Sequence, residues 1–447
     1  MRGIELNING AGAAGANVRV RIAPPGFLGQ RREWPLDTGA LDAPGQNPVR
    51  ATGEALLRRL AKANVEITQA IDILLGLPPA QVNPLYLRIT DAQSATLPWE
   101  TLYSNGDFLA LQPSSPIARI ADPAGRLSDR EFVASPQLRV VAVLSAFHQP
   151  ASDEWEALRD ASVAARAANP PLDIKLTVLV GEPALQQQIE KEVARGVDFV
   201  VVETIPSTAD QLLTRLENEM PHVLHLYCHG KVDGPVRRLH FGTASEWIAR
   251  QDGQQGTGSL NVGIAALTGT VVNASSWLVV INACKGGTDT PEDYSLAGEL
   301  VRQGVPAAIG HRQSISPPDA HRFARELYRS LFSLVAREFA VGGQREIEWA
   351  EVLHAPRSGL QARYGDPADS EFWSLPILHV GEMPFKVRIV PAGDAVAAAA
   401  ANRESGTTGT LTEALRAVAT LDVPSAVVND LLQPLDPVSA ADLRNDM

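Results

Sequence analysis

The chain has 447 residues and a mass of 47.8 kDa, which corresponds to roughly two to four domains or one large elaborated domain. Hydrophobic residues make up 45% of the chain and charged residues 20%, a globular balance that excludes wholesale disorder, collagen and coiled coil. The formal net charge of −12 repels phosphate backbones, and the basic residues are scattered. We therefore expect no direct nucleic-acid partner.

Cysteine usage and hydropathy indicate the compartment. The chain has two cysteines, Cys228 and Cys284, which is too few for a disulfide framework and favours a reducing environment. The first residues lack the apolar segment of a signal peptide, and no run approaches the ~18–20 apolar residues that a membrane helix needs. We expect a cytoplasmic protein without a membrane partner.

The N-terminal region gives weaker signals than the rest of the chain. Residues 1–50 are rich in Gly, Pro, Ala and Asn, with a possible strand at Val18–Ile22. Apolar residues at i+3/i+4 spacing predict one helix over residues 53–76. Short strands are expected at Leu85–Ile89, Phe108–Leu111 and Ile117–Ile120.

From Leu138 the sequence alternates between apolar strands and amphipathic helices. The strands are expected at Leu138–Leu144, Ile174–Val180, Asp198–Val202, His222–Cys228, Trp277–Ala283 and Pro306–Gly310. The helices are expected at Glu154–Ala167, Ala184–Ala194, Ala209–Glu219, Ser295–Gln303 and Pro318–Ala336. Continuous apolar strands alternating with helices predict a parallel sheet covered on both faces.

Two further segments are expected to lack a core of their own. Gly253–Gly263 is predicted to be a loop, because it is rich in glycine and has few apolar residues. Residues 391–410 form an Ala/Gly-rich linker, and residues 411–447 form a short helical tail, too short to fold alone, that would dock on the main domain or on a partner.

Two strand ends carry residues suited to nucleophilic chemistry. One predicted strand is followed by His229 and Gly230, and another by Cys284, with glycines close behind. Carboxyl ends of neighbouring parallel strands meet at one edge of a sheet, so we expect the imidazole and the thiol to lie side by side. An imidazole activates a thiol by lowering its pKa or taking its proton, and the backbone N–H groups of Gly230 and Cys284 would stabilise the oxyanion.

The spacing and the residues around the cysteine resemble a known family. Cys284 follows His229 by 55 positions (284 − 229) within Asn-Ala-Cys-Lys-Gly-Gly. The caspase pattern is Gln-Ala-Cys-[Arg/Gln/Gly]-Gly with a His about 50 residues upstream, and Asn282 and Lys285 depart from it. The segments Leu97–Tyr103, Ser295–Ala297, Gly304–Gly310 and Phe323–Leu331 also resemble the CHAT peptidases, a caspase- and separase-like branch of the cysteine peptidases. The resemblance covers about residues 80–385.

This resemblance implies an α/β fold: a caspase-like three-layer α/β/α sandwich in which a degenerate half precedes the active half. We expect an N-terminal region with the degenerate half at 1–135 and the active CHAT peptidase domain at 136–390. The implied activity is a cysteine endopeptidase with His229 as base and Cys284 as nucleophile, needing no metal or cofactor. The resemblance also implies a bacterial signalling or defence role and release by a partner protein, which the tail would recruit.

Other interpretations stay open. The chain could be a catalytically silent caspase-fold interaction module or adaptor, or a Ca²⁺-dependent metacaspase-like enzyme, although no EF-hand-like loop pattern is present. Four histidines (His222, His225, His229 and His240) with Cys228 invite a metal site, but no C-x-x-C or H-E-x-x-H accompanies them. His225 is expected to be a core histidine or a group that orients the base, and Cys228, Trp99 and Trp373 are expected in the core.

The sequence leaves the substrate preference undecided. Asp289 and Asp293 follow the predicted nucleophile and could line a pocket for a basic side chain. Arg312 and Gln313 follow the next predicted strand and could instead recognise an acidic or polar side chain. A solvated acidic loop is the simpler interpretation of the two aspartates.

Overall fold

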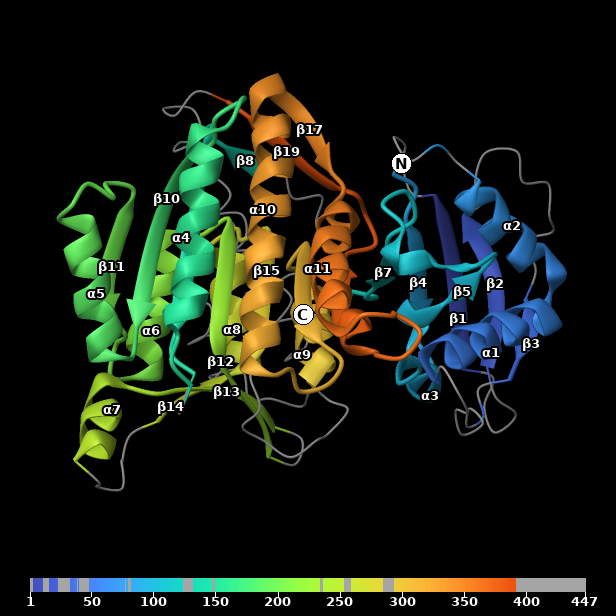
Figure 1. Ribbon diagram of the computed structural model, residues 1–447, viewed down its shortest axis with the longest axis horizontal. Coiled ribbons are helices and arrows are strands. Elements are labelled where there is room, and N and C mark those ends of the chain that lie inside the picture. Colours follow the sequence, from blue (N-terminus) through green and yellow to red (C-terminus); the bar gives the residue numbers. More distant parts are fainter. Residues whose placement is uncertain are drawn as a thin grey trace, which may run out of the picture.

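The computed structural model describes residues 3–10, 16–22, 33–37, 39, 48–76, 78, 82–123, 132–146, 149–233, 236–252, 259–283 and 293–390, with the backbone alone at 92, 231–233, 236–237, 283 and 293–295. Within these residues one mixed β-sheet runs through the molecule and joins a smaller N-terminal half to a larger half (Figure 1). Helices cover the sheet, which gives the layered α/β architecture expected from the sequence.

Six parallel strands form the larger half of the sheet. Their order is β11 (Val200–Thr204), β10 (Asp173–Val180), β9 (Gln137–Leu144), β12 (Val223–Asp233), β15 (Leu278–Ala283) and β16 (Ala307–His311). The chain starts at β9, moves outward to β11 on one side, and then returns to β12 on the other. The strand order therefore reverses between β9 and β12, and in open α/β sheets ligands bind at the carboxyl ends of the strands beside such a switch point.

Helices bury the apolar side chains of this half on both faces. One face is covered by α4 (Ser152–Ala167), α5 (Pro183–Val193) and α10 (Pro317–Val341), and the other by α6 (Ala209–Glu219), α8 (Ile264–Asn273) and α9 (Asp293–Arg302). In Figure 1, α4 and α10 lie side by side across the near face. The inner strands are mostly apolar because both of their faces are covered.

The smaller half continues the same sheet. Its strands are β7 (Ile117–Ile120), β4 (Leu85–Ile89), β1 (Ile4–Gly10), β2 (Ala16–Ile22) and β3 (Trp34–Leu36), packed with α1 (Pro48–Ala63) and α2 (Val65–Leu75). The connecting strand is β18 (Pro376–Val380), which pairs antiparallel with β16 and parallel with β7. The two halves therefore meet along a strand from the C-terminal part of the described chain.

Shorter elements complete the described structure. β13 (Val236–Phe241) pairs antiparallel with the C-terminal part of β12 and with β14 (Leu260–Gly263). A small sheet holds β17 (Gly343–Ile347), β19 (Phe385–Ile389) and β8 (Phe132–Ala134). The remaining pieces are α3 (Ala92–Ala95), β5 (Tyr103–Ser104), β6 (Asp107–Phe108), α7 (Ala244–Gln251), α11 (His354–Tyr364) and the 3₁₀ turns Trp99–Thr101, Leu109–Leu111, Trp349–Leu353 and Phe372–Ser374.

Some predicted elements differ in number or type from those in the structure. The helix expected over 53–76 is two helices, because the side chain of Asn64 accepts a hydrogen bond from the Glu66 amide and starts α2 anew. The strand expected at Phe108–Leu111 ends at Phe108 and continues as a 3₁₀ turn. Leu260–Gly263, expected in a loop, is β14, because Leu260 and Val262 alternate into the core.

Trp99, Trp373 and Cys228 are buried, as predicted. The domain boundaries and the degenerate character of the first half stay predictions. The linker at 391–410 and the tail at 411–447 lie outside the described residues.

Candidate active site

The two strands that carry the candidate dyad are direct neighbours. β12 and β15 are parallel, and their paired residues run from Val223 and Leu278 to Cys228 and Ala283. His229 is therefore the first residue of β12 beyond this ladder. Cys284 is the next residue of the chain after the last paired residue of β15, and it lies outside the described residues.

β12 is longer than the sequence predicted. It continues to Asp233 and leaves the parallel sheet to pair with β13, beyond the lower sheet edge in Figure 1. His229 lies opposite His240, and Gly230 lies opposite Leu239. Gly230 is thus inside β12, whereas the sequence placed it after the strand, because β12 gains a second partner where its first one ends. The His229 side chain is mostly buried, with 8% of the residue exposed.

Cys228 and His229 are consecutive residues of β12, and alternation along the strand places their side chains on opposite faces of the sheet. Cys228 is fully buried in a cluster with Leu226 and Ile281, on the face covered by α6, α8 and α9. Tyr227 belongs to the cluster on the opposite face, which α4 and α10 cover. Residues 225, 227 and 229 share that second face, so Cys228 and His229 point in opposite directions.

A buried polar cluster lies below the strand ends on the α4 and α10 face. The Glu154 carboxylate accepts a hydrogen bond from Asn282 Nδ2 at 2.7 Å, and its Oε1 lies 2.8 Å from His225 Nε2. Its other oxygen lies 2.7 Å from His321 Nδ1. Asn282 Nδ2 also donates to the Ala320 carbonyl at 3.0 Å, and its Oδ1 lies 3.0 Å from His311 Nε2. The cluster thus joins α4, β12, β15, β16 and α10.

The electrostatics of this cluster fix its protonation. Burial alone would raise the pKa of Glu154, but the contacts with His225 and His321 outweigh it and lower the pKa to about 2. Burial lowers the pKa of His311 to about 4, against the opposing fields of Glu154 and Asp319. At neutral pH Glu154 is therefore ionised and His311 neutral. Because Asn282 Oδ1 is an acceptor, His311 carries its proton on Nε2.

The predicted specificity residues have different surroundings. The Arg312 guanidinium is nearly buried and forms an ion pair with Glu371 at 2.8 Å, whereas Gln313 is exposed. Asp289 lies outside the described residues, and Asp293 begins α9 with its side chain outside them. Arg312 is therefore already engaged by the protein, and the choice between the two pocket hypotheses stays open.

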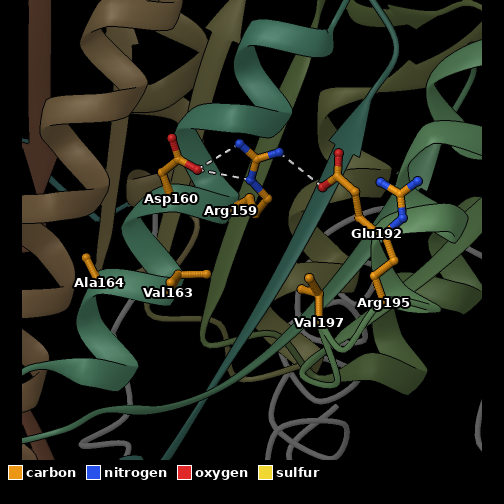
Figure 2. A pocket seen from close by; sticks show the side chains of 7 residues that line it. All are labelled: Arg159, Asp160, Val163, Ala164, Glu192, Arg195 and Val197. Carbon is orange, nitrogen blue, oxygen red and sulfur yellow. Dashed lines mark hydrogen bonds and ion pairs between the residues drawn. The ribbon is translucent and has the colours of Figure 1, made fainter.

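One groove lies on the helical face, away from the strand ends. Its volume is about 700 Å³, and the lining residues come from α4, α5 and the turn before β11: Arg159, Asp160, Val163, Ala164, Glu192, Arg195 and Val197. Figure 2 shows Arg159 between Asp160 and Glu192, to which it is ion-paired at 2.8 and 3.1 Å. None of the candidate site residues lines this groove.

Two findings concern other kinds of function. Within the part of the chain that the structure describes, no group of three or more His, Cys, Asp or Glu residues is arranged to hold a metal ion. The short N···O distances around Glu154 are hydrogen-bonding distances. None of the helices in the described ranges is both long and apolar enough to span a membrane.

Sequence reasoning missed Glu154, His311 and His321. The helix dipole ordinarily favours an acidic residue in the first turn of a helix, so the position of Glu154 in the sequence did not predict a buried site. A usable signal was present, because Glu154 falls on the same stripe of α4 as Leu158, Ala161 and Ala165, all buried. A carboxylate on an apolar stripe indicates a buried partner.

The chain matches the model of the CHAT domain over residues 50–345, more than half of its length. It therefore belongs to the CHAT domain family, and this membership confirms the resemblance found in the sequence.

Comparison with individual proteins adds little. No curated protein matches the sequence. Among solved structures, the chain is similar to one in the crystal structure of the Saccharomyces cerevisiae separase–securin complex, with 10% identity and a TM-score of 0.33. The match covers 75% of this chain and 18% of that one, so this chain spans about a fifth of its length.

Proposed function

We propose that the protein is a cysteine endopeptidase in which Cys284 is the nucleophile and His229 the general base. The observation that carries the proposal is the register of β12 and β15, whose last parallel pair joins Cys228 to Ala283. The proposal is that this register continues by one residue, to His229 and Cys284. Neighbouring strands lie about 4.8 Å apart, which suits a hydrogen bond between an imidazole and a thiol.

The proposed reaction follows from these two side chains. His229 takes the thiol proton, and the Cys284 sulfur adds to the scissile carbonyl carbon. The backbone N–H groups of Cys284 and Gly230 stabilise the oxyanion, and His229 then protonates the leaving amine. Water, deprotonated by His229, hydrolyses the thioester and restores the free thiol. This chemistry uses no metal or cofactor.

We further propose that a partner protein controls this activity in a bacterial signalling or defence system, as the family resemblance implies. An endopeptidase that is always active would damage its host cell, so a low basal activity is expected. The tail at 411–447, tethered by the linker at 391–410, is the proposed recruiting segment.

The test is a proteome-wide search for new protein N-termini in cells that express the parent protein or Cys284→Ala. The proposal expects a set of new N-termini that is present with the parent protein and missing with Cys284→Ala. Identical sets from the two proteins, with both at equal abundance and with the activating system present, would favour the adaptor interpretation.

A further inference from the structure

Glu154 is a buried carboxylate that the proposed mechanism does not use. It is fully buried, and among the described residues its polar partners are His225, Asn282 and His321, none of them Lys or Arg. The other titratable groups near this cluster are His311, Asp319 and Tyr328. Burial and the negative charge of Glu154 raise the pKa of Tyr328 well above its usual value. Tyr328 lies edge-on to His225, with ring centroids 5.5 Å apart.

Stability does not account for such a group. A buried ionised carboxylate loses its hydration, and well-packed apolar residues commonly serve the core as well or better. Glu100 offers a contrast in the same molecule, since it is equally buried but accepts two hydrogen bonds from the Arg119 guanidinium, at 2.9 and 2.8 Å. Glu154 has no such guanidinium, which points to a role other than stability.

The partners of Glu154 lie directly before the proposed dyad on both strands. His225 precedes His229 by four residues, and alternation places both on one face of the sheet. Asn282 is the second residue before Cys284 in the sequence, and it lies on the same face as His225 because both contact Glu154. His321 lies beside Tyr227, with ring centroids 5.4 Å apart, and Tyr227 is the residue between His225 and His229 on that face.

We infer that Glu154 is a positioning residue for the dyad: through His225 and Asn282 its carboxylate holds the carboxyl ends of β12 and β15 at matching heights, so that His229 meets Cys284. The inference rests on the proposed function. The physical basis is that one carboxylate contacts side chains on both strands: it accepts a hydrogen bond from Asn282 on β15, and its Oε1 lies 2.8 Å from His225 Nε2 on β12. From the opposite side, α4 carries the carboxylate and His321 of α10 is hydrogen-bonded to it. A displacement of about 1 Å between reacting groups can lower a rate on the order of 10²-fold.

The test compares Glu154→Gln with Glu100→Gln, both in a Cys228→Ala background so that Cys284 is the only thiol. The amide of Gln has no negative charge and carries an NH₂ donor in place of one acceptor oxygen, so it cannot keep the contacts of both carboxylate oxygens. Glu100→Gln is the matched control, since it neutralises an equally buried carboxylate whose hydrogen-bond partner Arg119 lies on β7. The probe is iodoacetamide, and its reaction rate with Cys284 is measured across the neutral pH range alongside thermal unfolding.

The expected result separates positioning from stability. A dyad thiol has a pKa below the ordinary value of about 8.5, and Glu154→Gln should return the alkylation profile toward that value, with a rate at neutral pH lower on the order of tenfold. Both variants should unfold at a lower temperature than the parent protein, but Glu100→Gln should keep the parent alkylation profile. An unchanged profile in folded Glu154→Gln would overturn the inference and leave the proposed function standing. An ordinary thiol profile in the parent protein would overturn both.

Should Glu154→Gln fail to fold, His321 provides the second test. His321→Asn keeps an N–H donor near the position of Nδ1, whereas His321→Leu removes it. The inference expects the parent alkylation profile for His321→Asn and a shifted profile for His321→Leu. Equal profiles in these two folded variants would contradict it.

Discussion

The two cysteines of this chain have opposite expected roles. Cys284 is the proposed nucleophile, so Cys284→Ala should abolish cleavage and leave the fold intact. Cys228 is fully buried among apolar side chains and points away from His229, so Cys228→Ala should leave turnover within a few-fold of the parent. The measurement is cleavage of a substrate protein found by the N-terminal search. Parent-like turnover by Cys284→Ala would exclude it as the nucleophile.

Two histidines of β12 can be told apart by their surroundings. His229 lies beyond the parallel ladder, whereas His225 lies inside it, fully buried against Glu154. His229→Ala should lower kcat by a factor on the order of 10²–10⁴, the usual contribution of a general acid–base group. His225→Ala should lower it less. If His225→Ala proves the more damaging and His229→Ala is mild, the base has been assigned to the wrong histidine.

The buried cluster also predicts how stability depends on pH. His311 has a pKa of about 4 in the folded protein and about 6.5 when unfolded, so between these values only the unfolded chain binds the proton. The contribution of neutral His311 to the free energy of unfolding is complete above pH 6.5 and is lost as the pH falls toward 4. Over this range the free energy of unfolding falls by up to about 1.4 kcal/mol per pH unit. Glu154 adds a second loss at lower pH, from about 4.5 down to about 2.

Urea unfolding at a series of pH values measures this slope. His311→Gln keeps an N–H donor near the position of Nε2 and cannot titrate, so its free energy of unfolding should fall less steeply below pH 6.5. A remaining slope is expected from His222, whose pKa is also lowered by burial, and from the acidic groups. Equal slopes for parent and variant would contradict a neutral His311 in the folded protein.

Among the secondary-structure elements, one side chain of α11 bridges β7 and β18 in addition to their backbone ladder. The fully buried Arg357 guanidinium donates to the Ile117 carbonyl of β7 at 3.3 Å and to the Pro376 carbonyl of β18 at 3.0 Å. Burial lowers its pKa to about 10, so it stays charged at neutral pH. Arg357→Met should lower the free energy of unfolding by about 1–3 kcal/mol, because buried carbonyls lose their donors.

Arg322 gives a matched control for this prediction. It is exposed on α10, and its one described hydrogen bond, to the Gly359 carbonyl, is long at 3.4 Å. Arg322→Met should change the free energy of unfolding by about 0.5 kcal/mol or less. Equal urea midpoints for the two variants would show that Arg357 does not hold the two halves of the sheet together.

The sequence could predict some secondary-structure elements but not others. The strands of the larger half are continuous apolar runs, and β9, β10 and β15 begin within a residue of their predicted positions and end where predicted. β13 was missed because Arg237 and Arg238 interrupt its apolar pattern, and its partner β14 was taken for a loop. The sequence analysis expected β12 and β15 to be neighbours in the sheet, since both strands end in residues suited to one site. The Glu154 cluster depends on how α4 and α10 pack on the sheet, and residue spacing alone does not reveal that packing.

At the scale of the whole molecule, the continuous sheet bears on how the protein is controlled. The described core ends at residue 390, and its strands tie both halves into one sheet through β18. A large rearrangement of the sheet would break many backbone hydrogen bonds. Control is therefore expected to act on the chain around the strand ends, where residues 253–263 lie between base and nucleophile in the sequence.

The tail provides the corresponding prediction. If residues 411–447 recruit a partner that orders the loops around Cys284, the ordering assembles the oxyanion donors beside the dyad. The partner then shifts the population toward an active site without altering the core. Deleting 411–447 should then leave the basal cleavage of a small peptide unchanged and remove the response to the partner. The measurement is peptide turnover by the full chain and by the truncated chain, each with and without the partner. A truncated enzyme that responds as the full chain does would exclude a recruiting role for the tail and place the control within residues 1–390.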